Sequence, residues 1–440
     1  MTLSERARAV PDSGIAPVIA EVRNLKVHFQ TKAGIVHAVD GVDFSIRDGE
    51  TLGLVGETGC GKSVTARSFL RLIPMPPGIQ VDGSIAFRPH RICDGCTGEG
   101  CTICGFTGRI PAKCPSCAGS GCITCGNTGT EQVDLLRIPE KRLRQIRGNR
   151  IAMIFQDPGK ALNPSMSVRQ QVGEVFLQHR TREVLVNAGL DPDDTSTLLE
   201  RRASLQSRFV ERWALALPPY RSDRNRIDKA VDRMTKFALA ETQIPNPLKV
   251  MDRYPHELSG GMKQRVMIAQ ALACNPDLLI ADEPTTALDV TVQARIIELI
   301  RELQGRTKTA VLYISHDLSL VKRVCDRVAV MYAGRIVEVG TADELFNDPQ
   351  HPYTRGLLAA IPSSSHERGR LVAIEGTVPE LVDPDPGCRF SGRCPHEAEV
   401  CGTRDPILTP TGEDHAVACF IHHPPEAPAA SIPGFERSVR

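Results

Sequence analysis

The stretch Gly56-Glu57-Thr58-Gly59-Cys60-Gly61-Lys62-Ser63 fits the pattern G-x-x-x-x-G-K-[ST], which is typical of loops that grip nucleotide phosphates. The apolar run at residues 51–55 predicts a buried parallel strand before it, and residues 63–70 predict a helix after it. The glycines allow successive backbone N–H groups to turn toward anionic oxygens. We therefore expect the whole run through Val64 to line a nucleotide, with Lys62 on the β- and γ-phosphates and the Ser63 hydroxyl on Mg²⁺.

Bulk properties limit the classes of function. The 440 residues are enough for two or three domains, and 53 basic side chains nearly balance 52 acidic ones. Because nucleic-acid binders usually carry a basic surplus, we expect no nucleic-acid partner. No apolar run approaches the roughly 20 residues that cross a bilayer, and the first residues lack an apolar signal core. These features predict a soluble, cytoplasmic chain that reaches a membrane only through partners.

The region before the phosphate-binding loop predicts a tail followed by antiparallel strands. Residues 1–20 are expected to be flexible, and an alternating apolar pattern starts at Glu21 and runs to Ile46. Phe29 lies within this pattern, where it could stack on an adenine ring or simply fill the core. A second hairpin begins at residues 82–87 and resumes at residues 133–136.

Residues 91–130 interrupt that hairpin with a cysteine-rich insertion. Four C-x-x-C pairs each present two thiolates to a tetrahedral ion, so eight cysteines suit about two Zn²⁺. The repeat C-x-x-C-x-G-x-G resembles the zinc module of DnaJ-type chaperones, and nested pairing of the four knuckles is favoured. The insertion could be a structural knob or a docking surface, and a redox role is less favoured. The eight cysteines are Cys93, Cys96, Cys101, Cys104, Cys114, Cys117, Cys122 and Cys125.

Further along the chain, polar residues follow apolar runs that predict strands. Gln156 follows residues 151–155, and the acids Asp282 and Glu283 end the run 278–283, where one acid suits Mg²⁺ and the other can polarise water. His316 follows residues 311–315 and is expected to be catalytic or to act as a switch. Between these runs lies Leu258-Ser259-Gly260-Gly261-Met262-Lys263-Gln264-Arg265, in which Ser259 can cap a helix and the glycines leave N–H groups open to an anion.

Together these segments resemble an ATP-binding cassette (ABC) ATPase over about residues 21–345. The resemblance implies an α/β fold, with a RecA-like core, an antiparallel β subdomain and a helical subdomain at 168–257 that is longer than usual. It makes Gly56–Ser63 the Walker A motif, Gln156 the Q-loop residue and Asp282-Glu283 the end of Walker B. It also implies nucleotide contacts by Ser259, Gly260, Gly261, Gln264 and the D-loop residue Asp289, with Met262 departing from the common signature.

Two stretches resemble the dipeptide, oligopeptide and nickel importers within that family. Gln156-Asp157-Pro158 is similar to their Q-loop, and residues 346–440, with His351-Pro352-Tyr353-Thr354 and Arg393-Cys394-Pro395, are similar to their C-terminal extension. This resemblance implies a [4Fe–4S] cluster in the extension, while Zn²⁺ and free thiols stay open because the spacing is not diagnostic. The four cysteines concerned are Cys388, Cys394, Cys401 and Cys419.

The resemblance also implies a mechanism and a set of partners. Two ATP molecules would lie between two head-to-tail ATPase subunits, either copies or paralogues. Mg²⁺ would be held by Ser63 and Gln156, with Asp282 acting through water, Glu283 as general base and His316 on the γ-phosphate. The subunit would sit peripherally on the cytoplasmic face of the membrane, beneath two permeases that an extracytoplasmic solute-binding protein supplies.

The expected function is therefore an ATPase that drives peptide import. One alternative is an importer of another solute, such as nickel or a glycoside, because the ATPase does not touch the solute. A different class is a DNA-repair ABC ATPase, which also carries zinc modules, but those proteins fuse two cassettes and this chain has one Walker A motif.

Overall fold

The computed structural model describes residues 16–92, 109–114, 116–118, 120, 130–193, 199, 220–285, 290–361 and 374–423. The chain divides into two units, and each is described here by itself. Unit 1 comprises Met1–Glu140 and Gln304–Arg440, and unit 2 comprises Lys141–Leu303. Two helices run through the limits between the units in the sequence, α2 (Glu140–Ile146) and α11 (Val290–Thr307).

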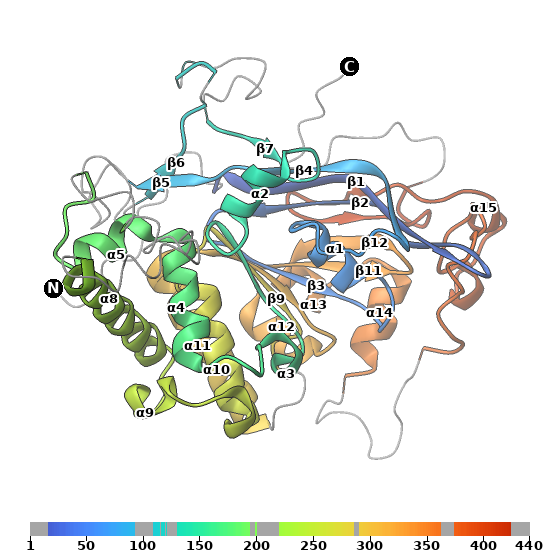
Figure 1. Cartoon of the computed structure of the whole chain (residues 1–440). Helices are drawn as coiled ribbons and strands as arrows, with labels where there is room; N and C mark the ends of the chain where they lie inside the picture. Colours follow the sequence, from blue (N-terminus) through green and yellow to red (C-terminus); the bar gives the residue numbers. More distant parts are fainter. Residues whose placement is uncertain are drawn as a thin grey trace, which may run out of the picture. The chain divides into compact units, whose positions relative to one another are not determined.

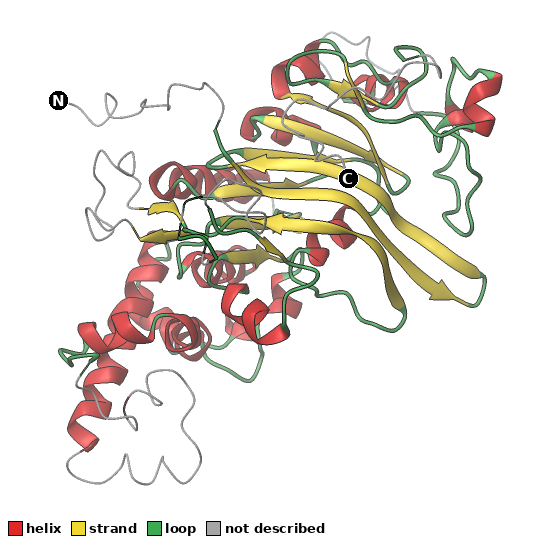
Figure 2. Cartoon of the chain, turned by 90° about the horizontal axis from the view of Figure 1, so that it is seen from above, coloured by secondary structure: helices red, strands yellow, loops and turns green. Residues whose placement is uncertain are grey.

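An antiparallel sheet forms the first layer of unit 1. The long strands β1 (Val18–Thr31) and β2 (Gly34–Arg47) pair as a hairpin, as the alternating pattern predicted. The sheet order is β2-β1-β4-β7, with β4 (Gly78–Phe87) and β7 (Val133–Asp134). The yellow arrows of these long strands dominate Figure 2. The pairing of β4 with β7 confirms that the hairpin resumes after the cysteine-rich insertion.

A second sheet of unit 1 carries the phosphate-binding loop. Its strands follow the order β13-β14-β12-β11-β3-β10, and β3 (Thr51–Val55) lies between two parallel neighbours, β10 (Ala310–Ile314) and β11 (Arg327–Tyr332). All five residues of β3 are buried, as a near-continuous apolar run in a parallel sheet predicts. The remaining strands are antiparallel and comprise β12 (Arg335–Thr341), β13 (Thr409–Pro410) and β14 (Ala416–Val417).

Short helices accompany this sheet. Helix α1 (Lys62–Ser68) follows β3 directly, and α12 (Leu318–Val324), α13 (Ala342–Asn347) and α14 (Pro352–Ala359) follow the later strands. A 3₁₀ turn, η5 (Ser391–Arg393), and α15 (Glu399–Thr403) belong to the C-terminal extension. Figure 1 labels α15 in the orange-red part of the chain.

The extension is attached to β12 through a buried carboxylate. Glu338, which is fully buried, accepts hydrogen bonds from the backbone N–H groups of Gln350 (2.7 Å) and His351 (3.0 Å). It also pairs with the His415 ring at 2.8 Å. Because a buried carboxylate is stable only when its oxygens are satisfied, these contacts hold both ends of the extension against the sheet.

Unit 2 contains a parallel strand pair and a helical layer. The strands are β8 (Ile151–Ile154) and β9 (Leu278–Asp282), and both are fully buried. The helices are α3 (Pro158–Ala161), α4 (Val168–His179), α5 (Thr181–Asn187), α8 (Tyr220–Glu241), α9 (Pro247–Met251) and α10 (Gly260–Leu272), with the 3₁₀ turn η4 (Pro255–Glu257). A single apolar cluster joins α4, α5, α8, α9 and α10, and Figure 1 labels these helices in green and yellow.

Within the cysteine-rich insertion the structure describes residues 91–92, 109–114, 116–118, 120 and 130. Strand β5 (His90–Ile92) pairs with β6 (Arg109–Pro111), and Lys113 bridges Thr130. These pairings place the middle of the insertion beside the strand where it leaves the fold and beside Thr130, where it rejoins. Among the described helices, none is both long and apolar enough to cross a membrane.

Candidate functional site

The phosphate-binding loop depends on glycines at two crowded positions. Gly56 has φ +151° and Gly61 has φ +106°, backbone angles that residues other than glycine rarely adopt. A Cβ atom on Gly56 would lie 2.0 Å from the Met331 carbonyl oxygen, and one on Gly61 would lie 2.3 Å from that of Ala38. The neighbouring strands β11 and β2 therefore press directly on the loop backbone and fix its shape.

Lys62 lies inside this loop. Its side chain is buried, and the ammonium donates to the carbonyl oxygens of Gly56 (2.8 Å) and Glu57 (3.0 Å). A buried ammonium requires such partners. The loop therefore holds a positive charge against its own backbone, next to the Ser63 hydroxyl in the sequence.

His316 follows the strand beside the one that leads into the loop. Strands β10 and β3 are parallel with Ile314 opposite Leu54, so His316 and Gly56 leave neighbouring strands at the same edge of the sheet. His316 is exposed there. The next residue, Asp317, caps α12 by accepting from the N–H groups of Ser319 (2.9 Å) and Leu320 (3.2 Å).

In unit 2, two predicted catalytic residues are in contact. Strands β8 and β9 are parallel with Ile154 opposite Ala281, which brings the residues that follow them together. The amide Nε2 of Gln156 donates to Oε2 of Glu283 at 2.7 Å. Glu283 has φ +46°, a left-handed conformation that is costly for a residue with a side chain and clusters at functional sites. The strand ends thus hold a carboxylate in a strained, hydrogen-bonded position.

The Ser259–Arg265 segment supports the same turn. Ser259 caps α10, accepting from the Met262 N–H, as its sequence position predicted. Gln264 is buried, and its Nε2 donates to the Pro284 carbonyl oxygen at 2.6 Å. Since Pro284 follows Glu283 directly, Gln264 positions the turn that carries the carboxylate. Nucleotide contact by Ser259, Gly260, Gly261 and Gln264 stays a prediction.

Two further predicted residues differ in how far the structure describes them. Phe29 is half-buried on β1, opposite Gly78 of β4, and its ring lies beside that glycine. Stacking of Phe29 on adenine therefore stays a prediction. Asp289 and the two residues before it lie outside the described residues.

The structure adds two residues of the C-terminal extension that sequence reasoning missed. The Glu57 N–H donates to the Tyr353 hydroxyl at 3.0 Å, and Arg393 donates to both carboxylate oxygens of Glu57, at 2.9 and 3.2 Å. Tyr353 and Arg393 stand 296 and 336 residues beyond Glu57, so no local pattern could pair them. Their only signal was their membership of the His-Pro-Tyr and Arg-Cys-Pro stretches.

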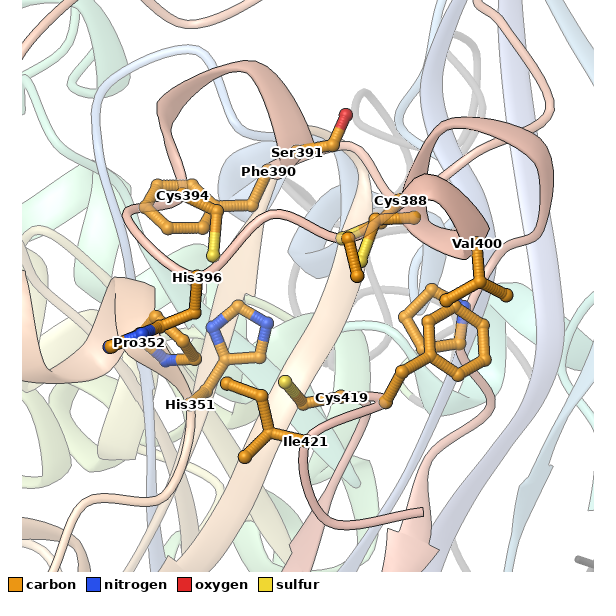
Figure 3. A pocket seen from close by; sticks show the side chains of 14 residues that line it. His351, Pro352, Cys388, Phe390, Ser391, Cys394, His396, Val400, Cys419 and Ile421 are labelled. Carbon is orange, nitrogen blue, oxygen red and sulfur yellow. The ribbon is translucent and has the colours of Figure 1, made fainter. Parts of the chain in front are cut away.

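The four cysteines of the extension line one cavity of about 210 Å³. Figure 3 shows the sulfur atoms of Cys388, Cys394 and Cys419 directed toward the space between them, with the imidazoles of His351 and His396 nearby. Burial raises the pKa of Cys388 to about 12 and also raises the pKa values of Cys394 and Cys419. Metal binding here therefore has to displace thiol protons.

A zinc ion and an iron–sulfur cluster would place different demands on these sulfur atoms. Sulfurs around one tetrahedral Zn²⁺ lie about 3.8 Å apart, given Zn–S bonds of about 2.3 Å. Among the described residues, no three cysteine sulfurs lie within 4.8 Å of one another. A [4Fe–4S] cluster needs four thiols around one cavity, one cysteine for each iron, so the group that binds here, cluster or Zn²⁺, stays a prediction.

The structure describes only two of the eight cysteines that are predicted to bind zinc at residues 91–130. Cys114 is buried and Cys117 is partly exposed. The other six cysteines of the insertion, Cys93, Cys96, Cys101, Cys104, Cys122 and Cys125, lie outside the described residues. Zinc binding by the insertion therefore stays a prediction.

Two family models match this chain, one over the part that carries the phosphate-binding loop and one over the C-terminal extension. A model of the family described as "ABC transporter" matches residues 39–96 and 119–286, a match that omits part of the insertion. A model described as "Oligopeptide/dipeptide transporter, C-terminal region" matches residues 337–401. These two matches contain the phosphate-binding loop and the Glu57 partner Arg393, respectively.

Curated relatives match almost end to end. The dipeptide transport ATP-binding protein DppD of Bacillus subtilis is 38% identical over 92% of this chain and 94% of its own length. The oligopeptide transport ATP-binding protein OppD of the same organism is 38% identical over 94% of this chain and 92% of its own. A dimeric ATP-binding cassette solved with ADP and Pi covers 74% of this chain and 99% of its own, with a TM-score of 0.46 and 18% identity. The chain belongs to the ABC-transporter ATP-binding proteins, and within them to the group that carries the oligopeptide/dipeptide transporter C-terminal region.

Proposed function

We propose that this chain is the ATP-hydrolysing subunit of an ABC importer for peptides. The observation that carries the proposal is the Gln156–Glu283 contact of 2.7 Å in a chain whose extension belongs to the oligopeptide/dipeptide group. The names of the relatives, which are dipeptide and oligopeptide transport proteins, support the choice of substrate class. The alternatives within the same importer group are importers of nickel or glycosides.

The residues divide the reaction between binding and hydrolysis. Gly56–Val64 would hold the phosphates of ATP, with the Lys62 ammonium against the transferred phosphoryl group. Mg²⁺, which prefers hard oxygen donors, would be held by Ser63 and Gln156, with Asp282 acting through water. Glu283 would take a proton from the attacking water.

Catalysis also needs a group that senses the γ-phosphate and a second subunit. His316 would contact the γ-phosphate as charge builds up in the transition state. The Ser259–Gly261 segment and Asp289 of a second ATPase subunit would complete each nucleotide site. Gln156 would have two roles. Its side-chain Nε2 donates to Glu283 in the structure, and its side-chain oxygen would bind Mg²⁺.

The proposed partners follow from the family. Two permease subunits would receive the motion of the ATPase pair at the membrane surface, and an extracytoplasmic solute-binding protein would deliver the peptide. The cysteine-lined cavity would hold a [4Fe–4S] cluster through Cys388, Cys394, Cys401 and Cys419, and the insertion would hold about two Zn²⁺. A cluster supplies structural cross-linking or electron transfer, and no step of ATP hydrolysis is routed through it.

Uptake measurements test the proposal. The chain is reconstituted in proteoliposomes with its two permeases, its solute-binding protein and a paralogous ATPase if one is encoded beside it. We expect ATP-dependent uptake of labelled peptides and none with Glu283→Gln. Uptake of nickel or a glycoside without peptide uptake would overturn the substrate class.

Metal analysis of anaerobically purified protein tests the cysteine sites separately. We expect about four iron and two zinc per chain. Three zinc without iron would contradict the cluster, and absence of both metals would contradict both sites.

A further inference from the structure

The phosphate-binding loop is held from outside by the C-terminal extension. Two residues of the extension contact Glu57. The Glu57 N–H donates to the Tyr353 hydroxyl, and both carboxylate oxygens of Glu57 accept from the guanidinium of Arg393. Paired N–H···O bonds between a guanidinium and a carboxylate are among the stronger and more directional polar contacts. The side chain of Arg393 is only 8% exposed, so water competes weakly for this pair. One residue of the loop is therefore fixed at its backbone and at its side chain.

All three guanidinium nitrogens of Arg393 donate hydrogen bonds in the described structure. Its Nε donates to the Glu375 carbonyl oxygen at 2.9 Å, and its Nη1 also reaches the Tyr332 hydroxyl at 3.2 Å. The guanidinium also lies over the Tyr332 ring, 5.7 Å from the centroid. The side chain is thus held in one position between the loop and the extension.

The same short turn that carries Arg393 carries two of the cavity cysteines. Within it, Ser391 N–H donates to the Cys388 carbonyl (3.0 Å) and Cys394 N–H donates to that of Ser391 (2.9 Å). Arg393 directly precedes Cys394. A group bound by Cys388 and Cys394 would therefore fix both ends of the turn from which Arg393 reaches Glu57.

A second connection runs through aromatic rings. Phe390, in the same turn, lines the cavity and packs against Tyr353, with ring centroids 5.5 Å apart. Tyr353 in turn packs on Tyr332 at 4.5 Å. Both residues that hold Glu57 are therefore in contact with the wall of the cysteine-lined cavity.

We infer that Arg393 is a positioning residue for the phosphate-binding loop, and that through it the metal-loaded state of the cysteine-lined cavity sets the affinity for nucleotide. The inference rests on the proposed binding of ATP at Gly56–Val64. Coupling between two sites is reciprocal, so nucleotide should also slow the loss of metal from the cavity. The cavity would act as a regulator of binding without taking part in hydrolysis.

Arg389 offers a matched control for Arg393. It lies in the same turn beside Cys388, its side chain is also 8% exposed, and it pairs with Asp40 of β2 at 2.7 Å. Arg389 therefore anchors the extension without touching the loop. A variant that merely loosens the extension should behave like Arg389→Gln, whereas loss of the loop contact should be particular to Arg393→Gln.

The first experiment titrates the full chain, purified without oxygen, with a fluorescent ATP analogue. We expect Arg393→Gln to weaken nucleotide binding about fivefold to tenfold, at the lower end of ordinary coupling strengths. KM should rise by a similar factor while kcat stays within about twofold, and Arg389→Gln should change neither. Equal affinities for Arg393→Gln and the wild type would overturn the inference, whereas absence of binding by the wild type would overturn the proposed function instead.

The second experiment tests the route through Glu57. If Arg393 acts through this carboxylate, Glu57→Gln added to Arg393→Gln should weaken binding little further, since the two contacts are one interaction. Fully additive effects would contradict the route. Glu57→Gln alone keeps Arg393 in place, so it provides the same readout if Arg393→Gln fails to fold.

The third experiment removes metal from the wild type and from Arg393→Gln with a chelator and an oxidant, and iron and zinc are counted before and after. We expect metal loss from Cys388, Cys394, Cys401 and Cys419 to weaken nucleotide binding in the wild type and to leave the already weakened variant nearly unchanged. Equal weakening in both proteins, or none in the wild type, would overturn the coupling. A Cys114→Ser variant, altered in the other cysteine-rich segment, controls for metal lost from the insertion.

Discussion

The phosphate-binding loop and the Glu283 turn are held in opposite ways. Residues far along the chain hold the loop, with Tyr353 and Arg393 both attached to Glu57. Neighbours within unit 2 hold the turn, with Gln156 on the carboxylate and Gln264 on the following carbonyl. The difference teaches that nucleotide binding and hydrolysis depend on separate sets of contacts, so substitutions should affect one without the other.

The largest effect should come from removing the cation of the loop. Lys62→Ala deletes the buried ammonium that the Gly56 and Glu57 carbonyls hold. We expect nucleotide affinity to fall by about a hundredfold, since one charged contact to phosphate is worth roughly 3 kcal/mol. Equilibrium binding of labelled ATP measures it. Arg67→Ala, at an exposed position of the same helix, should bind normally, and an unchanged affinity for Lys62→Ala would break the comparison.

Removing Gln156 should affect hydrolysis more than binding. Gln156→Ala takes away the amide that holds the Glu283 carboxylate. We expect kcat to fall by about tenfold to thirtyfold, in keeping with the loss of an orienting hydrogen bond, and nucleotide Kd to stay within about threefold. Steady-state hydrolysis and binding, measured together, separate the two effects. Lys160→Ala, nearby in the sequence and highly exposed, is the control, and a loss of binding equal to the loss of kcat would contradict the division.

A smaller effect concerns the pH dependence of the extension that holds the loop. Burial lowers the pKa of His351 to about 4, and its Nδ1 accepts from the Tyr353 N–H. The unfolded chain protonates this residue near 6.5, so the free energy of unfolding should fall by about 3 kcal/mol as the pH drops from about 6.5 to 4. Asn also caps helices but does not titrate there, so His351→Asn should flatten this slope in thermal unfolding against pH. An unchanged slope would contradict the assignment.

The neighbouring His415–Glu338 pair should stabilise the fold less at high pH and less at low pH. Burial alone would lower the pKa of His415, but its hydrogen bond with Glu338 raises the pKa overall. Its stabilising contribution is therefore full below about 6.5 and is lost as the pH rises through the raised value. Burial alone would raise the pKa of Glu338, but the bond with His415 lowers it overall, so this contribution is lost only as the pH falls below about 4.5. Together the two contributions should accordingly be greatest between about pH 4.5 and 6.5.

Much of the fold could be read from local patterns. The buried runs at residues 51–55, 151–154 and 278–282 are strands, and the alternation from Glu21 to Ile46 is an antiparallel hairpin. Such patterns work because burial on one or both faces of a sheet dictates the period of apolar residues. The contact of Gln156 with Glu283 was also accessible in outline, since parallel strands end at one edge of a sheet.

The rest depended on contacts that no local pattern encodes. Arg393 meets Glu57 only because β12, α14 and the turn after Cys388 return the chain to the loop, and its sequence neighbours give no hint of a partner. The left-handed backbone of Glu283 likewise has no compositional sign, because glycine or asparagine would usually mark such a position. Gln264 stood in a stretch that predicted nucleotide contact, yet its buried amide holds the Pro284 carbonyl.

The most direct test of the account measures ATP binding and phosphate release by Glu283→Gln in the same preparation. Gln keeps the shape of the side chain but cannot take a proton, so we expect binding within about threefold of the wild type and phosphate release at least a hundredfold slower. Glu302→Gln, which neutralises an exposed carboxylate on α11, should match the wild type in both. Phosphate release by Glu283→Gln at a rate near that of the wild type would contradict the account.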